Sequence, residues 1–371
     1  MKKVINLFVL LMFVLCSCNE ETLALEEIKS SNECQHSDER QQLQLFFQAL
    51  DSLNQSIPTA ESRSLIVDLE DGSEVGLTPE FGSTIVDYAG GWAGRLLGRW
   101  GGSAIGAALG NPAVACIGYV YGSHIGRVVG YELSSYIYSL IVSSEDDTWG
   151  PKSIDFYYSM QIQPSKMMDE NLKGIVTSFG SNLKPLVDKE PIISGEIGEN
   201  TISIEKCDSI GYFHNYAMYD LWKNKDKYVS NNGIDIDLIY NDIVAHTKMA
   251  GIYDDVLENL SVKVALKEMA MNLSMLTKGI IAKDQSYDFL IEQNMSYMQS
   301  EYLMFDEELD IFKELIEKIG KKCTQLSQLE IDNYAAEIQA LILNSGLSPD
   351  TKYEMAASAQ MIVNSALCWQ Q

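Results

Sequence analysis

Residues 88–130 read YAGGWAGRLLGRWGGSAIGAALGNPAVACIGYVYGSHIGRVVG, and this stretch decides the fold of the chain. Glycine recurs at every fourth position in two runs. The first run is Gly90, Gly94, Gly98, Gly102, Gly106 and Gly110, and the second is Gly118, Gly122, Gly126 and Gly130. Period four is close to the helical repeat, so each run predicts a helix with a smooth ridge along one side. Because an interior helical glycine costs roughly 1 kcal/mol relative to alanine, contact between the ridges must offset this loss.

The two runs predict a helical hairpin with a turn at Asn111 and Pro112. A helix over residues 88–110 would be about 35 Å long, and one over residues 113–143 longer, whereas the hydrocarbon core of a bilayer is about 30 Å thick. Small residues at every fourth position also favour close helix packing inside membranes. The stretch therefore predicts a hairpin able to insert into a membrane.

Charged residues argue against permanent insertion of this hairpin. Arg95 and Arg99 would each cost roughly 2.5–3.5 kcal/mol at mid-bilayer, and His124 and Arg127 add polarity to the second helix. Cooperative insertion, with the arginines facing a water-filled lumen, is the behaviour of a pore former that is kept soluble until use. Two alternatives stay open: a hairpin buried in a soluble domain, and a two-helix zipper that anchors or stiffens the cell envelope.

Composition restricts the class of protein. The 371 residues are 46% apolar and 21% charged, which is typical of folded proteins, and the net charge of -25 disfavours nucleic acid as a partner. Residues 88–143 hold 12 of the 26 glycines and carry a net charge of +2, from three arginines and one glutamate. The seven cysteines show no CxxC spacing, and HExxH, GxSxG and Walker patterns are absent from the sequence. We therefore expect no enzyme, no cofactor and no metal site.

The N-terminus predicts a lipoprotein. Lys2 and Lys3 precede an apolar run over residues 4–15, as in a secretory signal peptide. The segment ends in Leu-Cys-Ser-Cys, which resembles the lipobox of bacterial lipoproteins and implies Cys18 as the lipidated residue. Asn19 and two glutamates follow at once, similar to the acidic export signal of Bacteroidetes-type surface lipoproteins. We therefore expect a lipid anchor in the outer membrane, facing the cell surface.

The whole chain is predicted to be mainly α with minor β, with a central glycine-zipper hairpin and a C-terminal helical bundle. Five segments are expected: a signal peptide over 1–17, an acidic leader with an amphipathic helix and a cleavable linker over 18–63, the membrane-insertion hairpin over 64–145, a mixed α/β connector over 146–206, and the helical bundle over 207–371. Short strands are expected at 64–69 and within 192–205. Ser348 and Pro349 predict a helix start.

Apolar spacing predicts individual helix faces. One is Leu43, Phe46, Phe47, Leu50 and Leu53; a second is Ile252, Val256, Leu260 and Val264; a third is Ile311, Leu315 and Ile319.

Two short patterns within the bundle resemble signatures of helical domains in secreted and surface proteins of gut Bacteroidetes. They are GYFHN at residues 211–215 and the terminal AASAQMIVNSALCWQQ at residues 356–371. The residues themselves predict that His214 and Asn215 form a hydrogen-bonding pair inside the bundle, with a ligand site as the alternative.

The lipobox, the double glycine zipper and the helical remainder together resemble the lipoprotein bacteriocins of gut Bacteroidales. This resemblance implies a surface-anchored, pore-forming antibacterial toxin that is released by a clostripain-like protease cutting after arginine. It also implies a target-cell bilayer, an oligomer in the membrane and an immunity protein as partners. The alternative class is a non-toxic envelope or adhesion lipoprotein whose bundle binds a partner.

Arginine positions suggest where such a protease cuts. The chain has five arginines; three lie in the zipper, and Arg40 heads the first amphipathic helix. Arg63 lies in the polar segment TAESRSLI, so cleavage between Arg63 and Ser64 would free residues 64–371 from the lipid. The alternative is that Arg63 is a solvated surface charge.

Overall fold

A computed structural model describes residues 24–57, 78–108, 112–144, 149–151, 207–230, 233–249, 255–283 and 285–369 of the chain. It is mainly α with one small antiparallel sheet, as the sequence predicts. The longer helices are α2 (Ala24–Ser56), α3 (Pro79–Ala108), α4 (Pro112–Ser143), α7 (Cys207–Lys223), α8 (Ile236–Met249), α10 (Leu260–Ile281), α11 (Tyr287–Tyr302), α12 (Asp306–Leu315), α14 (Gln328–Asn344) and α15 (Pro349–Trp369). The short ones are η2 (Lys225–Lys227), α9 (Asp255–Glu258), η3 (Ile316–Gly320) and α13 (Lys321–Cys323).

The chain divides into two compact units, Met1–Phe47 and Gln48–Gln371, and α2 crosses the boundary between them. This helix begins well before the amphipathic stretch predicted from residues 43–53. Arg40 therefore lies inside α2 rather than at its start, so the expectation that it heads the helix is wrong. The reason is that polar residues with good helix propensity continue the helix where no apolar periodicity marks it.

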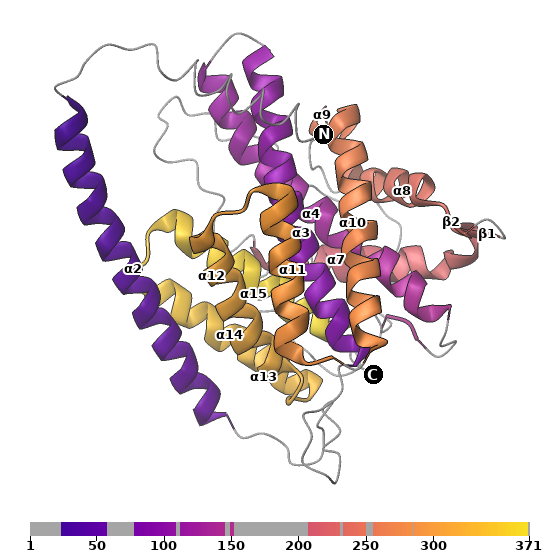
Figure 1. The fold of residues 1–371 in the computed structure, drawn as a ribbon. Coiled ribbons are helices and arrows are strands. Elements are labelled where there is room, and N and C mark those ends of the chain that lie inside the picture. Colours follow the sequence, from indigo (N-terminus) through magenta and orange to yellow (C-terminus); the bar gives the residue numbers. More distant parts are fainter. Residues whose placement is uncertain are drawn as a thin grey trace. The chain divides into compact units, whose positions relative to one another are not determined.

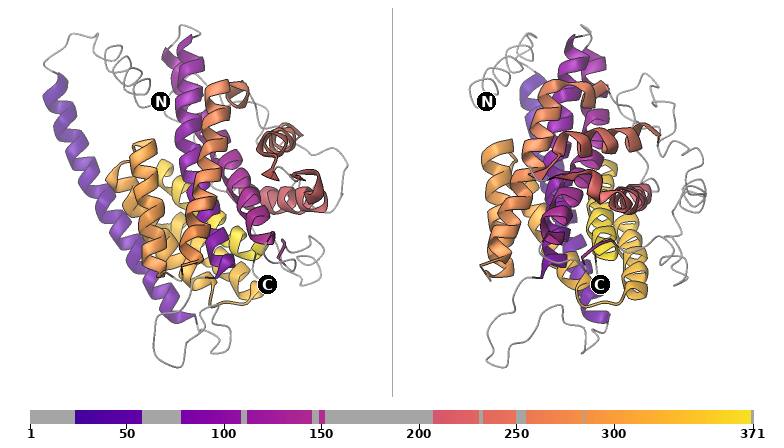
Figure 2. Two further views of the ribbon diagram at one scale, coloured as in Figure 1. Left: turned by 45° about the vertical axis from the view of Figure 1, so that its right-hand side comes forward. Right: turned by 90° about the vertical axis from the view of Figure 1, so that its right-hand side faces the viewer.

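The antiparallel helices α3 and α4 form the centre of the second unit, with helices of the C-terminal half around them. Figures 1 and 2 show the pair in purple and magenta, with α11 and α12 on one side and α15 on the other in the right-hand view of Figure 2. Residues 81–98 of α3 and 122–142 of α4 are all buried. A helix buried on every side requires a large surrounding core, which α7, α8, α10, α11 and α15 provide.

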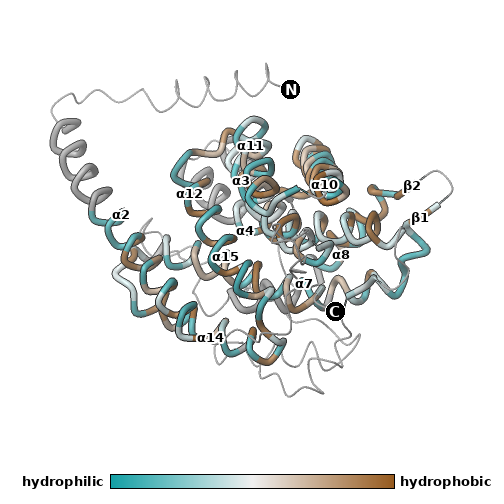
Figure 3. Tube along the Cα trace, turned by 60° about the horizontal axis from the view of Figure 1, so that its bottom comes forward, coloured by the Kyte–Doolittle hydropathy of each residue, from teal (hydrophilic) through white to brown (hydrophobic). Residues whose placement is uncertain are grey.

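Capping residues determine where several of the surrounding helices begin and end. Ser348 accepts a hydrogen bond from the amide of Thr351 at 3.2 Å, and α15 begins at Pro349, which confirms the predicted helix start. The expected continuous face through Leu260 is wrong, because Asn259 accepts hydrogen bonds from the first amides of α10 and ends α9, leaving Leu260 74% exposed. Figure 3 shows hydrophobic and hydrophilic positions alternating along these helices.

The third predicted face, Ile311, Leu315 and Ile319, lies on a helix whose hydrogen-bonding pattern changes along its length. It passes from α12 into η3, a π-helical turn, and both Leu315 and Ile319 are buried. The sheet consists of β1 (Val229–Ser230) and β2 (Gly233–Ile234), which pair antiparallel, and Gly233 has a φ of 108° that favours glycine. The strands expected at 64–69 and 192–205 lie outside the described residues.

Candidate functional site

The glycines of α3 and α4 face one another along the antiparallel pair. A Cβ atom placed on Gly98 would lie less than 3.0 Å from the carbonyl oxygen of Gly122, closer than real Cβ atoms approach. The same is true of Gly94 against Gly126 and of Gly90 against Gly130, and each relation holds in both directions. Since the obstructing atoms are backbone, no side chain can move aside to admit a larger residue.

This contact brings together six of the ten glycines singled out in the sequence: Gly90, Gly94, Gly98, Gly122, Gly126 and Gly130. Gly102 lies close to them, because a Cβ on Gly122 would meet the Cα of Gly102 at 3.1 Å. Gly106 and Gly118 belong to α3 and α4, and Gly110 lies outside the described residues. The glycines offset their low helix propensity by allowing the two backbones to meet.

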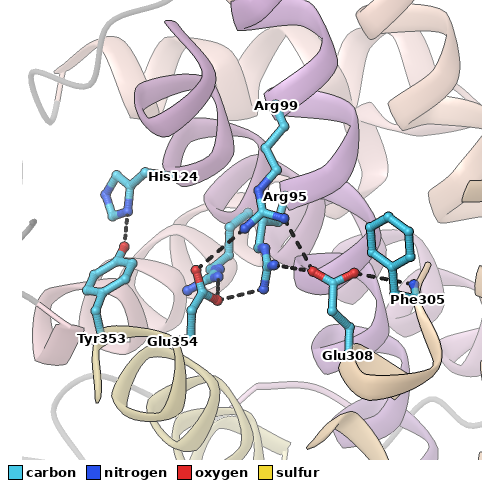
Figure 4. A network of polar contacts seen from close by, with 8 residues as sticks. Arg95, Arg99, His124, Phe305, Glu308, Tyr353 and Glu354 are labelled. Carbon is cyan, nitrogen blue, oxygen red and sulfur yellow. Dashed lines mark hydrogen bonds and ion pairs between the residues drawn. The ribbon is translucent and has the colours of Figure 1, made fainter. Parts of the chain in front are cut away.

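A first polar group surrounds the middle of the hairpin and is called here the arginine cluster: Arg95, Arg99, Arg127, Glu308 and Glu354. Arg95 bridges two helices, with Nη2 at 2.5 Å from Glu308 on α12 and Nη1 at 2.7 Å from Glu354 on α15. Arg127 of α4 also pairs with Glu354, and Arg99 lies 3.3 Å from Glu308 (Figure 4). Arg95 and Arg127 are only 4% and 1% exposed, so these carboxylates neutralise charges that water does not reach.

The arginines also control the protonation of Glu354. Burial would raise the pKa of this carboxyl group, but Arg127, Arg95 and Arg99 outweigh the effect and lower the pKa to about 2. Glu354 is therefore ionised at neutral pH and attracts all three guanidinium groups. Beside it, Tyr353 hydrogen-bonds to Nδ1 of His124 at 2.6 Å, so the start of α15 holds both helices of the hairpin (Figure 4).

A second buried polar group, called here the carboxyl cluster, lies further along α3 and α4 and comprises Asp87, Ser135, Ser365 and Trp369, while Glu132 of α4 is a further buried carboxyl group. Asp87 Oδ2 accepts hydrogen bonds from Ser365 Oγ at 2.5 Å and from Trp369 Nε1 at 3.1 Å. Both carboxyl oxygens of Glu132 are buried without a hydrogen-bond partner among the described residues. Burial of a carboxylate without a cation is so costly that its protonated form is favoured.

His214 lies against the same cluster in its neutral form. Its ring stacks on Tyr131 with centroids 3.8 Å apart, and its Nδ1 lies 2.8 Å from Asn215 Oδ1. Burial lowers the pKa of His214 to about 3, although the contact with Asn215 opposes this effect. The predicted hydrogen-bonding pair inside the bundle is therefore confirmed.

The two short patterns of the bundle meet on the hairpin. Asn215 from GYFHN donates to Asn364 Oδ1 at 3.5 Å, and Trp369 from the terminal pattern contacts Asp87 and Ser135. Sequence reasoning singled out both patterns but missed their common target. It also missed Glu308 and Glu354, which lie on ordinary amphipathic helices and have no local signal that distinguishes them from solvated acids.

Other expected sites are outside the part of the chain that the structure describes, namely Cys18, Arg63 and Ser64. Within that part, no cluster of three or more His, Cys, Asp or Glu side chains is arranged to hold a metal ion. Within the same residues, no helix combines the length and the apolar character needed to cross a bilayer.

Comparison of the chain with protein-family models, curated proteins and solved structures gives no match. The candidate site therefore rests on its own geometry: two antiparallel helices in backbone contact at glycine, buried over residues 81–98 and 122–142, with arginines neutralised by helices from the C-terminal half.

Proposed function

We propose that this protein is a surface lipoprotein that acts as a protease-activated, pore-forming antibacterial toxin. In this proposal α3 and α4 are a glycine-zipper hairpin stored inside a shell of helices until it meets a target membrane. One observation carries the proposal: residues 81–98 and 122–142 are buried on every side, yet they include charged groups whose partners belong to other helices.

The partners explain why storage and insertion need different environments. In the folded unit, Glu308 and Glu354 neutralise the three arginines of the hairpin. A hairpin that leaves this shell must provide water for those arginines, and a lumen lined by several hairpins would do so. The glycine ridges leave room for such packing of helices inside a bilayer. The proposal therefore requires a self-oligomer in the membrane.

Anchoring and release belong to the same proposal. Lipidation of Cys18 would hold the protein at the outer membrane of the producing cell, and a clostripain-like protease would release it by cutting between Arg63 and Ser64. A Cys18→Ala variant should lose a radioactive fatty-acid label, and the neighbouring Cys16→Ala variant should keep it. An Arg63→Ala variant should yield no soluble fragment beginning at Ser64. A fragment from that variant, or one that begins after Arg40, would contradict the release step.

Deployment of the hairpin can be tested by locking it in place. A Cβ on Gly91 would lie less than 3.0 Å from the sulfur of Met361 on α15, so these two positions face each other and are chosen for a disulfide between α3 and α15. A chain beginning at Ser64 with Gly91→Cys and Met361→Cys should leak dye from liposomes when reduced and fail to do so when oxidised. The reduced form is the matched control for both substitutions.

The alternative function is a non-toxic envelope or adhesion lipoprotein with a structural glycine hairpin. Burial of residues 81–98 and 122–142 also suits a permanent core, which favours this alternative. If the reduced, oxidised and unmodified chains all fail to leak dye from liposomes, the envelope or adhesion lipoprotein would be favoured over the toxin. An adjacent gene for a small membrane immunity protein would instead favour the toxin.

A further inference from the structure

The end of α2 is attached to the second unit by polar contacts, and residues 48–57 are called here the docked segment. Leu50 is fully buried, and Asp51 forms an ion pair at 2.6 Å with Lys318 of η3. The docked segment thus combines one buried apolar side chain with charged contacts near the surface. It immediately precedes residues 58–77, which contain the expected cleavage site.

Lys322 of α13 holds the C-terminal end of the docked segment. Its Nζ donates hydrogen bonds to the carbonyl oxygens of Asn54 at 2.8 Å and Ile57 at 2.7 Å. The last carbonyls of a helix have no partners within it, and a cation there is favourable for the helix dipole. Lys322 is 5% exposed with α2 in place, and departure of α2 would remove these two acceptors from its ammonium group.

Asn54 adds a second point of attachment. Its Nδ2 donates to the carbonyl oxygen of Lys318 at 3.0 Å, and its Oδ1 accepts from the hydroxyl of Tyr334 at 2.6 Å. The carbonyl of Lys318 lies in the π-helical turn η3, a kind of turn that is rare and frequently occurs at functional sites.

The junction is not closely packed. A hollow of about 550 Å³ is lined by residues of the docked segment, η3 and α13, among them Asp51, Lys318 and Lys321. A polar junction beside a hollow separates more readily than a packed apolar one. The polar contacts are therefore specific for the segment, and a single buried apolar side chain, Leu50, opposes its release.

The receiving surface connects to the arginine cluster through one helical rod. Helix α12, η3 and α13 follow each other without a break, and the residues at their junctions keep right-handed helical dihedral angles. Glu308 near the start of this rod pairs with Arg95 and Arg99 on the hairpin, and Lys322 near its end holds α2. A movement at one end can thus reach the other.

We propose that the docked segment is an autoinhibitory latch, which stays bound to η3 and α13 after the chain is cut and must dissociate before the hairpin can leave its shell. This inference rests on the proposed function for its last step. Its first step, retention of the cut segment, depends only on the contacts described above. Cleavage then prepares the protein for activation, and dissociation of the latch completes it.

The test uses the full chain, cut under native conditions with an arginine-specific protease. For the unmodified protein, size-exclusion chromatography with intact-mass detection should show the segment containing residues 48–57 in the same peak as the body. Lys322→Met keeps the length of the side chain but removes the ammonium group. It should accelerate dissociation about tenfold or more, because hydrogen bonds to a charged donor are among the strongest in proteins.

Lys227→Met is the control, since Lys227 is also a lysine in an ion pair, with Asp242 at 2.5 Å, but it does not line the hollow or contact the docked segment. This variant should retain the segment as the unmodified protein does. Immediate loss of the segment from the cut unmodified protein, or equal retention by Lys322→Met, would overturn the latch.

The cut Lys322→Met variant should also leak dye from liposomes faster than the cut unmodified protein. Unchanged leakage despite loss of the segment would refute autoinhibition. Absence of leakage from every form would count against the toxin, whereas the chromatography would still decide whether the segment docks.

Discussion

The glycine contact predicts opposite effects for the same substitution at two helical sites. Gly98 lies in the centre of the hairpin, where an added Cβ would meet the backbone of Gly122 at less than 3.0 Å. Gly279 lies in α10, where an added Cβ would meet no other atom within 4 Å. Both changes to alanine gain helix propensity of about 1 kcal/mol or somewhat less. Only the change at Gly98 forces two backbones apart.

The difference can be worked out from these surroundings. Gly279→Ala should raise the free energy of unfolding by about 0.5–1 kcal/mol, because nothing opposes the gain in propensity. Gly98→Ala should lower it by about 1–3 kcal/mol, the usual cost of overpacking a closely packed core. The two variants should therefore differ by roughly 1.5–4 kcal/mol although the chemical change is identical.

Urea unfolding followed by circular dichroism measures this difference, with linear extrapolation to water and comparison of the m-values. Comparable m-values would show that the variants expose similar surface on unfolding. Equal stabilisation by Gly98→Ala and Gly279→Ala would refute the backbone contact, since it would mean that the hairpin has room for a methyl group at its centre.

Three other predictions concern the polar clusters and the hairpin. Replacement of His214 by glutamine should remove a pH dependence, because the unfolded imidazole takes up a proton near pH 6.5 and the folded one, with a pKa of about 3, does not. The unmodified protein should therefore lose about 2 kcal/mol relative to the variant between pH 6.5 and 4.5. A difference in unfolding free energy that stays constant over this range would contradict the neutral buried ring. Glu354→Gln should lower stability by about 3–5 kcal/mol, because it leaves buried arginines without their carboxylate, whereas Asp237→Asn, which removes a 68% exposed partner of Lys267, should cost less than about 1 kcal/mol. Comparable losses for the two variants in urea unfolding would refute the stabilising role of Glu354. Gly122→Leu should abolish leakage from liposomes even where the variant binds them, and leakage at the unmodified rate would exclude the glycine ridge from the pore.

The sequence by itself determined the helices and where several of them begin. The spacing of glycine predicted α3 and α4, and Ser348 with Pro349 predicted the start of α15. These signals are local, since a helix satisfies its own backbone and a cap acts within one turn. Asn111 of the expected turn lies outside the described residues, whereas the second helix, predicted from residue 113, begins at Pro112.

Only the tertiary structure decided what the hairpin contacts. Arg95 pairs with Glu308 and Glu354, which are 213 and 259 positions away along the chain. His214 reaches Asp87 and Tyr131 in the same manner, and Lys322 holds the end of a helix that precedes the hairpin. Glu308, Glu354 and Lys322 have the sequence surroundings of ordinary surface residues, and the sequence around Arg95 and His214 does not identify their partners. Their partners are chosen by the packing of helices that are distant in sequence, and periodicity within one helix contains no information about which other helix will cover it.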